Sequence, residues 1–258
     1  MKLKLLSSMI VVSIIALTSC HKDDPAPQNP NPNPISAGTK KLKKVTMTEA
    51  GVATVYNLNY NGNTLLSYNT ADNLEHVIFS YDTQGNLTGI EDLEKDFKNI
   101  YAYTYANNQP VSGTFKSWQV VAGQPTNLIE DDRLTYTVTN NQVSNIFLEM
   151  LQTGDQTNLL LTYTDGNLTK VITDGQFPYT ADFSFGTHRS AFPKVSKFVL
   201  DQAGFSLQFA CNNDILSASY DFPGTTYDRL VNTHYTYDSN GYVLTSDDGT
   251  IQMVFEYQ

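Results

Sequence analysis

Apolar and polar residues alternate with a period of two through most of this chain, and the pattern restricts it to β-structure. Tyr101, Tyr103 and Tyr105 share one face of a short run whose other face carries Ala102 and Thr104. Successive side chains of an extended chain point to opposite faces, so the run predicts a strand with one buried aromatic face. The same alternation recurs at residues 134–138, 159–163, 181–185 and 251–257.

Turn-forming residues separate these runs. Asn, Asp and Gly tolerate the positive φ that tight hairpins need. Such residues recur at 61–62, 84–85, 107–108, 140–141, 165–166, 212–213 and 240–241. The spacing predicts an all-β fold, an antiparallel up-and-down meander of roughly 14–16 strands. The meander is expected to form a folded-over sheet or a water-soluble barrel, with one short helix at residues 91–99.

The hairpins also share a sequence motif. Residues 79–87 (FSYDTQGNL) match residues 235–243 (YTYDSNGYV), and weaker copies lie at 163–171 and 105–111. We expect the aromatic residue to pack on the core face and the aspartate to accept hydrogen bonds from turn amides. The glycine should take the left-handed conformation, and the following Leu or Val should pack on the return strand.

The first 20 residues resemble a bacterial lipoprotein signal. Lys2 and Lys4 begin it, and an apolar run at 5–17 follows that is too short to span a bilayer comfortably. Leu17-Thr-Ser-Cys20 is similar to a lipobox. In such signals the chain is cut before the cysteine, whose thiol and amino group are acylated. Residues 1–19 are therefore predicted to be a signal peptide and Cys20 a lipidated residue, held stably in a membrane by several acyl chains.

Residues 20–40 are expected to form a tether. Lys22, Asp23 and Asp24 resemble the surface-export signal of some Gram-negative lipoproteins, which favours the cell surface over the periplasmic side of the outer membrane. Proline and asparagine then alternate at 29–34. Proline has a fixed φ and no amide hydrogen, so this segment is neither helix nor central strand but an extended spacer. Residues 41–258 remain as a single β-repeat domain.

These sequence features resemble those of two known protein families. The Tyr-Asp pairs at 81–82 and 237–238 are similar to the tyrosine–aspartate (YD) repeats of the Rhs family. The lipobox, the tether and residues 41–258 together resemble a family of bacterial lipoproteins of unknown function with a porin-like fold. That resemblance implies the fold and assigns no functional residue. Most runs here are roughly six to eight residues, whereas a tilted membrane-spanning strand needs about 9–11, so a membrane-spanning barrel is disfavoured.

Charge and cysteine content exclude several classes of function. The chain has 16 basic and 26 acidic residues; without residues 1–19 it loses Lys2 and Lys4, and the remaining 14 basic residues give a net charge of −12. This balance opposes binding to nucleic acid, which needs clustered Lys and Arg. Cys211 is the second of two cysteines. It closes an alternating run at 205–211 and is predicted to be a buried, inert thiol on a strand.

No motif for catalysis or cofactor binding emerges. His21, His76, His188 and His234 share no short metal-ligand spacing. The acidic pairs 131–132 and 247–248 lack the alternating pattern of a calcium loop. No phosphate loop, Gly-x-Ser-x-Gly elbow or His-Glu-x-x-His is present. We expect no catalytic residue, no metal ligand and no cofactor, and therefore no enzyme.

Trp118, the one tryptophan, is the candidate for ligand contact. With Phe115 and the loop at 121–125 it is a possible sugar-stacking platform; the alternative is an aromatic ring packed at a strand end. The leading functional hypothesis is a binding module displayed on the cell envelope, with a glycan or an envelope protein as partner and a lipid anchor in the membrane. The alternatives are a non-catalytic structural envelope lipoprotein and, less favoured, a glycosidase that needs two close carboxylates in a cleft.

Overall fold

The computed structural model describes residues 40–175, 178–195 and 207–258. The predicted signal peptide, Cys20, the export residues Lys22, Asp23 and Asp24, and the tether up to residue 39 lie outside the described residues. Lys40–Gln258 form one compact unit, and the fold below is the fold of that unit.

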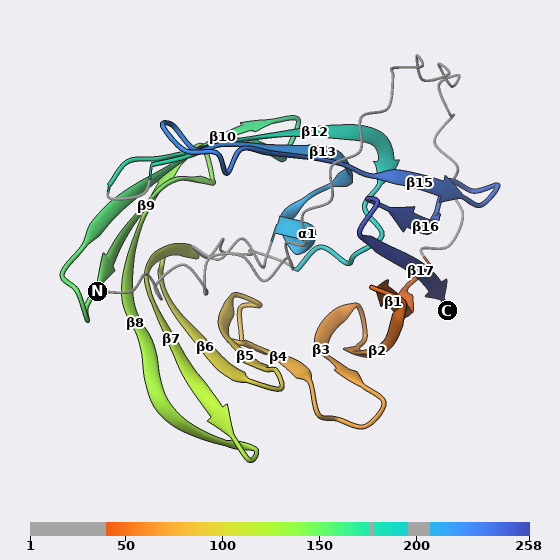
Figure 1. Ribbon diagram of the computed structural model, residues 1–258, viewed down its shortest axis with the longest axis horizontal. Coiled ribbons are helices and arrows are strands. Elements are labelled where there is room, and N and C mark those ends of the chain that lie inside the picture. Colours follow the sequence, from red (N-terminus) through yellow and green to blue (C-terminus); the bar gives the residue numbers. More distant parts are fainter. Residues whose placement is uncertain (1–39, 176–177, 196–206) are drawn as a thin grey trace. The chain divides into compact units, whose positions relative to one another are not determined.

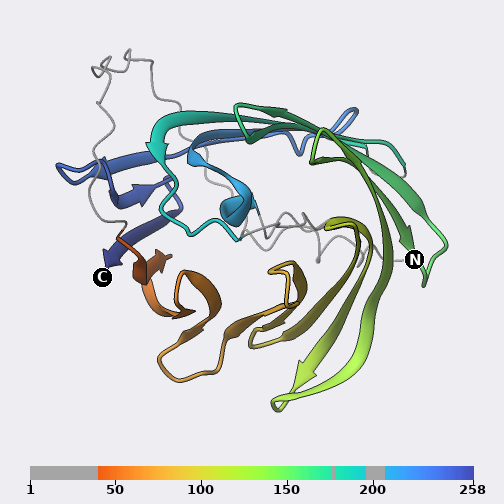
Figure 2. The same cartoon turned by 180° about the vertical axis from the view of Figure 1, so that it is seen from behind.

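The described residues form 17 β-strands and one short helix, drawn in Figures 1 and 2. In chain order they are β1 (Leu42–Glu49), β2 (Val52–Asn61), β3 (Thr64–Thr70), β4 (His76–Tyr81), β5 (Leu87–Leu93), β6 (Phe97–Ala106), β7 (Gln109–Val121), β8 (Gln124–Thr139), β9 (Gln142–Met150), β10 (Gln156–Thr164), β11 (Asn167–Thr173), β12 (Thr180–Arg189), α1 (Leu207–Ala210), β13 (Asn213–Asp221), β14 (Arg229–Asn232), β15 (His234–Tyr237), β16 (Val243–Asp247) and β17 (Ile251–Tyr257). None of the described residues belongs to a helix long and apolar enough to cross a bilayer.

The strands form an up-and-down meander that closes on itself. From β1 to β14 each strand pairs antiparallel with the next, and so do β15–β16 and β16–β17. β17 also pairs antiparallel with β1. The ring is offset at one place. There β14 pairs with β13, and β15, which continues β14 along the chain, pairs with β16 on the other side. The predicted all-β meander is confirmed, with 17 strands in a nearly closed barrel.

Backbone pairing between the two ends of the domain makes the closure. Val45 of β1 lies opposite Phe255 of β17, and the register continues to Glu49 opposite Ile251. Just before β1, the Lys41 amide donates to the Gln258 carbonyl at 3.0 Å and the Gln258 amide donates back at 2.9 Å. The C-terminus therefore lies beside the start of β1 (Figure 1).

The aromatic and aliphatic face of most strands points into the barrel. Tyr101 and Tyr103 are buried while Ala102 and Thr104 between them are exposed, as the alternation predicts. The buried set draws on strands around the whole ring and includes Leu42, Phe79, Ile90, Phe115, Leu134, Ile146, Leu161, Val171, Ala181, Val243 and Phe255. At roughly 25 cal/mol per Å² of apolar surface, burying this lining is the main force that holds the sheet closed.

α1, in the connection between β12 and β13, lies inside the ring of strands (Figures 1 and 2). The Phe209 ring lies 5.5 Å from Phe79 and 6.0 Å from Tyr68, on neighbouring strands. Phe192 links Phe209 at 5.6 Å to Phe255 at 5.7 Å. These contacts span the ring from β3 and β4 to β17.

Two local predictions are wrong. Residues 207–210 form α1 rather than a strand; among the described residues no strand pairs with this segment, and the Cys211 amide bonds to the Leu207 carbonyl at 3.2 Å. Residues 91–99 form no helix. They form the end of β5, the turn at 94–96 and the start of β6; Glu91 faces outward and pairs with Lys98 at 2.9 Å, while Asp92 faces inward and is buried.

The hairpin motif corresponds to a repeated geometry. In six hairpins the register shifts just before the residue at the motif's tyrosine position, which then lies opposite the first core position of the return strand. Asp82 accepts amide bonds from Gln84 and Asn86, and Asp238 accepts them from Asn240 and Tyr242. Gly85 and Gly241 have φ of 76° and 78°, as predicted. In the copy at 105–111 the opposing residue is Pro110 and Val111 is exposed, so that alignment was one residue off.

Tyrosine hydroxyls reinforce this end of the barrel. Each donates to the backbone carbonyl of a residue on a preceding strand: Tyr60 to Leu42, Tyr81 to Leu65, Tyr105 to Leu87, Tyr235 to Ile215 and Tyr257 to Val243, at 2.7–3.0 Å. We call this end, with the turns after β2, β4, β6, β8, β10 and β15, the tyrosine rim. The opposite end carries the turns after β1, β3, β5, β7, β9, β11, β13 and β16.

Candidate functional site

Charge is segregated between the two ends of the barrel. At the end opposite the tyrosine rim, the described turn residues include eight acids and Lys95 as their basic residue: Asp72, Glu75, Glu94, Asp96, Asp155, Asp174, Asp228 and Asp248. We call this end the acidic rim. At the tyrosine rim, Asp82, Asp165 and Asp238 are matched by Lys40, Lys41 and Lys194. The net negative charge of the domain is therefore concentrated at one end.

A group of carboxylates reaches from the acidic rim toward the barrel interior. Asp92 is buried and accepts a bond from Asn99 at 3.2 Å, and Glu75 accepts the Tyr56 hydroxyl at 3.0 Å. Burial raises the pKa of Glu94 to about 7, with further contributions from Asp92, Glu75 and Asp96. A carboxyl group with a pKa near 7 is present in both its protonated and its ionised form at neutral pH.

A second inward-facing carboxylate pair lies on β8. Glu130 and Asp132 project from the same face, hydrogen-bond to each other, and Asp132 is fully buried. Burial raises the pKa of Glu130. Ser117 of β7, also buried, lies opposite Glu130. The contact between the two carboxyl groups leaves no room for a sugar ring between them, unlike the separated carboxylates of glycosidases.

The β7–β8 hairpin projects past its neighbours at the acidic rim, as both views of the barrel show (Figures 1 and 2). Its strands are the longest, at 13 and 16 residues. β8 pairs with β9 only from Asp132 onward, so residues 124–130 extend beyond that neighbour. We call the projecting part, Ser117–Glu130, the arm.

Trp118 lies on the arm, half-buried, with Leu128 opposite it on β8 and Lys98 opposite it on β6. Leu128 and Val121 of the arm and Leu151 of the next turn are all exposed. The Gln152 amide donates to the Leu128 carbonyl at 3.3 Å, and Asn127 donates to Gln119 at 3.3 Å. The arm therefore presents a tryptophan and aliphatic side chains beside amide groups, a combination suited to ligand contact.

Phe115 is not part of this surface, so the predicted platform of Trp118 with Phe115 is wrong. Phe115 is buried and its ring lies 4.7 Å from Tyr101 inside the barrel. The two positions are three residues apart, and an odd separation on a strand places side chains on opposite faces. The predicted loop at 121–125 is the tip of the arm, where Ala122 and Gly123 have φ of 53° and 75°.

The remaining sequence candidates have structural roles. Cys211 is buried, and burial raises the pKa of its thiol to about 12, which agrees with an inert residue. Asp247 and Asp248 cap the β16–β17 turn by accepting amides from Gly249 and Thr250. Among the described residues no group of His, Cys, Asp or Glu is placed to hold a metal ion.

The three histidines that the structure describes lie at separate positions on the barrel. His188 stacks on Tyr237 with ring centroids 3.8 Å apart, at the tyrosine rim. His76 and His234 lie on β4 and β15. His21 lies outside the described residues.

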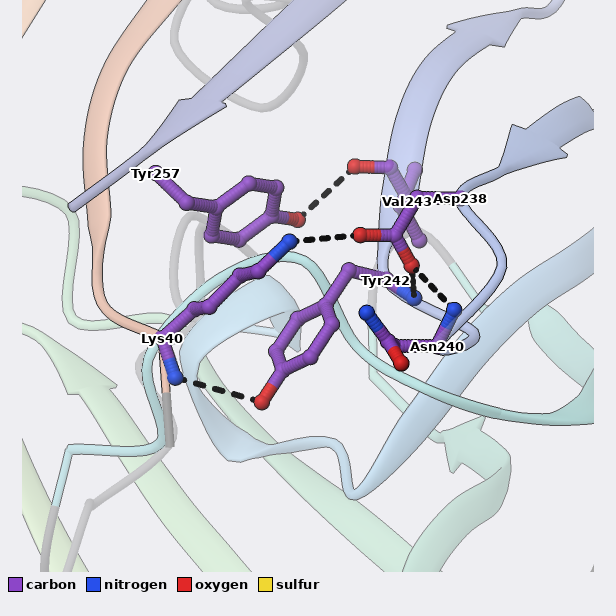
Figure 3. Close-up of polar contacts among 6 residues, drawn as sticks. All are labelled: Lys40, Asp238, Asn240, Tyr242, Val243 and Tyr257. Carbon is purple, nitrogen blue, oxygen red and sulfur yellow. Dashed lines mark hydrogen bonds and ion pairs between the residues drawn. The ribbon is translucent and has the colours of Figure 1, made fainter. Parts of the chain in front are cut away.

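The chain enters the barrel at the tyrosine rim, where Lys40 is held by three contacts (Figure 3). Its ammonium pairs with Asp238 at 2.6 Å and lies 5.0 Å from the centre of the Tyr242 ring, and its amide donates to the Tyr242 hydroxyl at 3.2 Å. Tyr242 packs edge-on against Tyr257, whose hydroxyl bonds to Val243. The entry point is thus fixed at the end of the barrel opposite the arm.

Sequence reasoning missed Glu94 and Leu128. Glu94 lay in a segment assigned to a helix, so its position at a turn between two paired strands was not foreseen. Leu128 could have been found by counting back from the turn at 122–123, since hairpin register places it opposite Trp118.

Comparison with known proteins identifies the fold. The sequence matches no known family model and no curated protein. The structure is similar to a porin-like protein from Bacteroides uniformis ATCC 8492, with a TM-score of 0.53 and 14% identity over 84% of this chain and 98% of that one. It is also similar to a porin-like protein from Bacteroides vulgatus ATCC 8482, with a TM-score of 0.56 and 10% identity over 85% and 99%. The expected porin-like fold is confirmed; the resemblances to a lipoprotein family and to YD repeats stay predictions.

The carboxylates at the acidic rim predict a pH-dependent stability. Glu94 has a pKa of about 7 in the fold against 4.5 when unfolded, so the unfolded chain releases its proton at lower pH. The free energy of unfolding should then fall as pH rises from about 4.5 through 7, by roughly 3 kcal/mol at most. In urea titrations, Glu94→Gln should gain stability relative to the wild type across this range. A difference that does not change between pH 5 and pH 8 would contradict this environment for Glu94.

Proposed function

We propose that this chain is a binding module displayed on the cell envelope, anchored to the outer membrane by lipid on Cys20 and exposed at the cell surface. The observation that carries the proposal is the opposition between the two ends of the barrel. The tether joins at Lys40 on the tyrosine rim, and the arm with Trp118 projects from the acidic rim. A lipid anchor at one end leaves the other end to face a partner.

The arm supports a glycan or an envelope protein as the partner. The half-buried Trp118 lies opposite the exposed Leu128, and the side-chain amide of Gln152 donates to the Leu128 carbonyl. Sugar rings present apolar faces that stack on aromatic side chains, with hydroxyl groups at their edges that bond to amides. We favour the glycan because this surface is small for a stable protein interface.

The outer surface supports a barrel held in water rather than one spanning a membrane. Five ion pairs link adjacent strands there: Lys44–Glu256, Glu91–Lys98, Lys116–Asp131, Arg133–Glu149 and Lys170–Asp182. Charged side chains facing lipid near the middle of a bilayer cost about 2–4 kcal/mol each. This surface is therefore consistent with a tethered domain outside the bilayer.

The interior supports a non-enzymatic role. The centre of the barrel is occupied by Phe192 and Phe209, and the β8 carboxylates contact each other directly. The same filled interior also favours the second candidate, a structural envelope lipoprotein without a small ligand. The two candidate functions are distinguished by whether the arm binds a ligand.

Anchoring is tested by Cys20→Ser. Without the thiol that accepts the diacylglycerol, the protein should leave the membrane pellet and appear in the soluble fraction after cell lysis. Alanine at Lys22, Asp23 and Asp24 serves as the matched variant: it should keep the protein in the pellet and remove its sensitivity to protease on intact cells. A Cys20→Ser protein that stays in the pellet contradicts the lipid anchor.

Glycan binding is tested with the purified chain on an array of bacterial and host polysaccharides. Trp118→Ala should lower the affinity roughly tenfold or more, because the stacking surface is lost. Tyr227→Ala removes another exposed aromatic side chain of the acidic rim and should leave the affinity unchanged. Absence of any bound glycan, together with cross-linking of the chain to envelope proteins in cells, would favour the structural candidate instead.

A further inference from the structure

Among the residues that the structure describes, one edge of the β14 backbone has no partner strand. Its residues pair with β13 on one side only, from Tyr220 opposite Arg229 to Ser217 opposite Asn232. On the other side, β16 reaches only to Asp247, opposite His234, and the chain then turns at Asp248 into β17. β14 thus overhangs the short β16–β17 hairpin at the acidic rim.

The hydrogen-bond pattern identifies which groups face the open side. The Thr233 amide donates to the Leu216 carbonyl at 2.9 Å, so Thr233 and Leu216 form a hydrogen-bonded pair of the antiparallel ladder. Such pairs alternate along a ladder, which directs the amide and carbonyl of Arg229 and Val231 toward β13. The amides and carbonyls of Leu230 and Asn232 therefore point away from the sheet. Within the residues that the structure describes, these two amides and two carbonyls have no backbone hydrogen-bond partner.

The side chains next to this edge are apolar and exposed. Leu230 is 63% exposed and Tyr227, in the loop before β14, is 66% exposed. An exposed strand edge flanked by apolar side chains is the usual template for addition of another strand. Residues Phe222–Asp228 do not cover it, because their turn is closed internally by bonds from the Phe222 amide to Asp228 and from the Tyr227 amide to Thr225.

The charges around the open edge of β14 indicate which kind of strand could add to it. Three carboxylates lie beside this part of the chain, Asp228 just before β14 and Asp247 and Asp248 at the end of β16, against the guanidinium of Arg229. A second copy of the chain in antiparallel register would bring these carboxylates together. It would also bury only four strand residues, far below the area that a stable dimer needs. A peptide with basic residues at its ends has the complementary charge.

We infer that the open edge of β14 is a docking site for an extended, positively charged peptide of a partner protein, which adds as a strand to the barrel. The peptide backbone bonds to the amides and carbonyls of Leu230 and Asn232, and an apolar residue of the peptide packs on Leu230. This site is separate from the arm, so it stands whether or not Trp118 binds a glycan.

The test uses fluorescence polarisation with the purified chain and three labelled probe peptides. The first alternates Val and Thr between terminal lysines, the second carries glutamates in place of the lysines, and the third is the lysine peptide with alternate backbone amides N-methylated. We expect the lysine peptide to bind, the glutamate peptide to bind at least tenfold more weakly, and N-methylation to abolish binding, since it removes backbone donors and keeps the side chains.

Variants of the protein locate the site. Leu230→Pro removes an outward amide and leaves the ladder to β13 intact, because proline is tolerated where its nitrogen faces away from the sheet. It should abolish binding, whereas Leu230→Ala keeps the amide and should bind only several-fold more weakly. Asn232→Pro is the second backbone variant, circular dichroism checks the fold, and Trp118→Ala should bind like the wild type.

Four outcomes would overturn the inference. Three concern the peptide: no binding of the lysine peptide, equal binding of its N-methylated form, and binding that survives both proline variants. Dimerisation of the chain alone that Leu230→Pro abolishes, measured by sedimentation, would assign the edge to a second copy and equally overturn it. Loss of glycan binding in Trp118→Ala has no bearing on these outcomes.

Discussion

The antiparallel pairing of β1 with β17 is the interaction on which the rest of the structure depends. Without it the 17 strands would form an open, twisted sheet with two long edges, and the aromatic face of that sheet would have no second layer to pack against. With it, each inward side chain meets others across the ring, and Phe209 reaches Tyr68 and Phe79 while Phe192 reaches Phe255. The tyrosine hydroxyl bonds then tie neighbouring strands at the rim where the closure is made.

Closure also decides how function is distributed over the molecule. Inside the ring, Phe192 and Phe209 contact rings from β3, β4 and β17, so the proposed contacts with partners lie at the rims. The tyrosine rim is occupied by turns, tyrosine bonds and the Lys40 contacts. Three features lie at the acidic rim: the projecting arm, the open edge of β14 and most of the turn carboxylates.

The sequence predicted the fold class because two strong local signals agree. Alternation fixed which side chains of residues 101–105 face the core, and the Tyr-Asp-Gly turns fixed the hairpins at 81–87 and 237–243. Closure was not predictable, since pairing of Val45 with Phe255 joins residues far apart in the chain and has no local signature. Nor was α1, since residues 207–211 alternate like a strand and become helical only where no partner strand lies beside them.

The site was predictable in part for the same reason. Trp118 was singled out by residue type; the structure places it half-buried on the arm, and its role in ligand contact stays a prediction. Its separation from Phe115 held a signal, the odd spacing, that places the two on opposite faces. Glu94 and the edge of β14 depend on where neighbouring strands stop, which no local pattern states.

Hydrogen exchange measured by NMR on residues 40–258 tests closure most directly. Alternate amides of β1 face β17 and the others face β2. A closed barrel predicts that both sets exchange slowly and at similar rates, together with the β17 amides that face β1. Fast exchange confined to the amides of β1 and β17 that face each other would show two free edges, and would contradict the closed barrel.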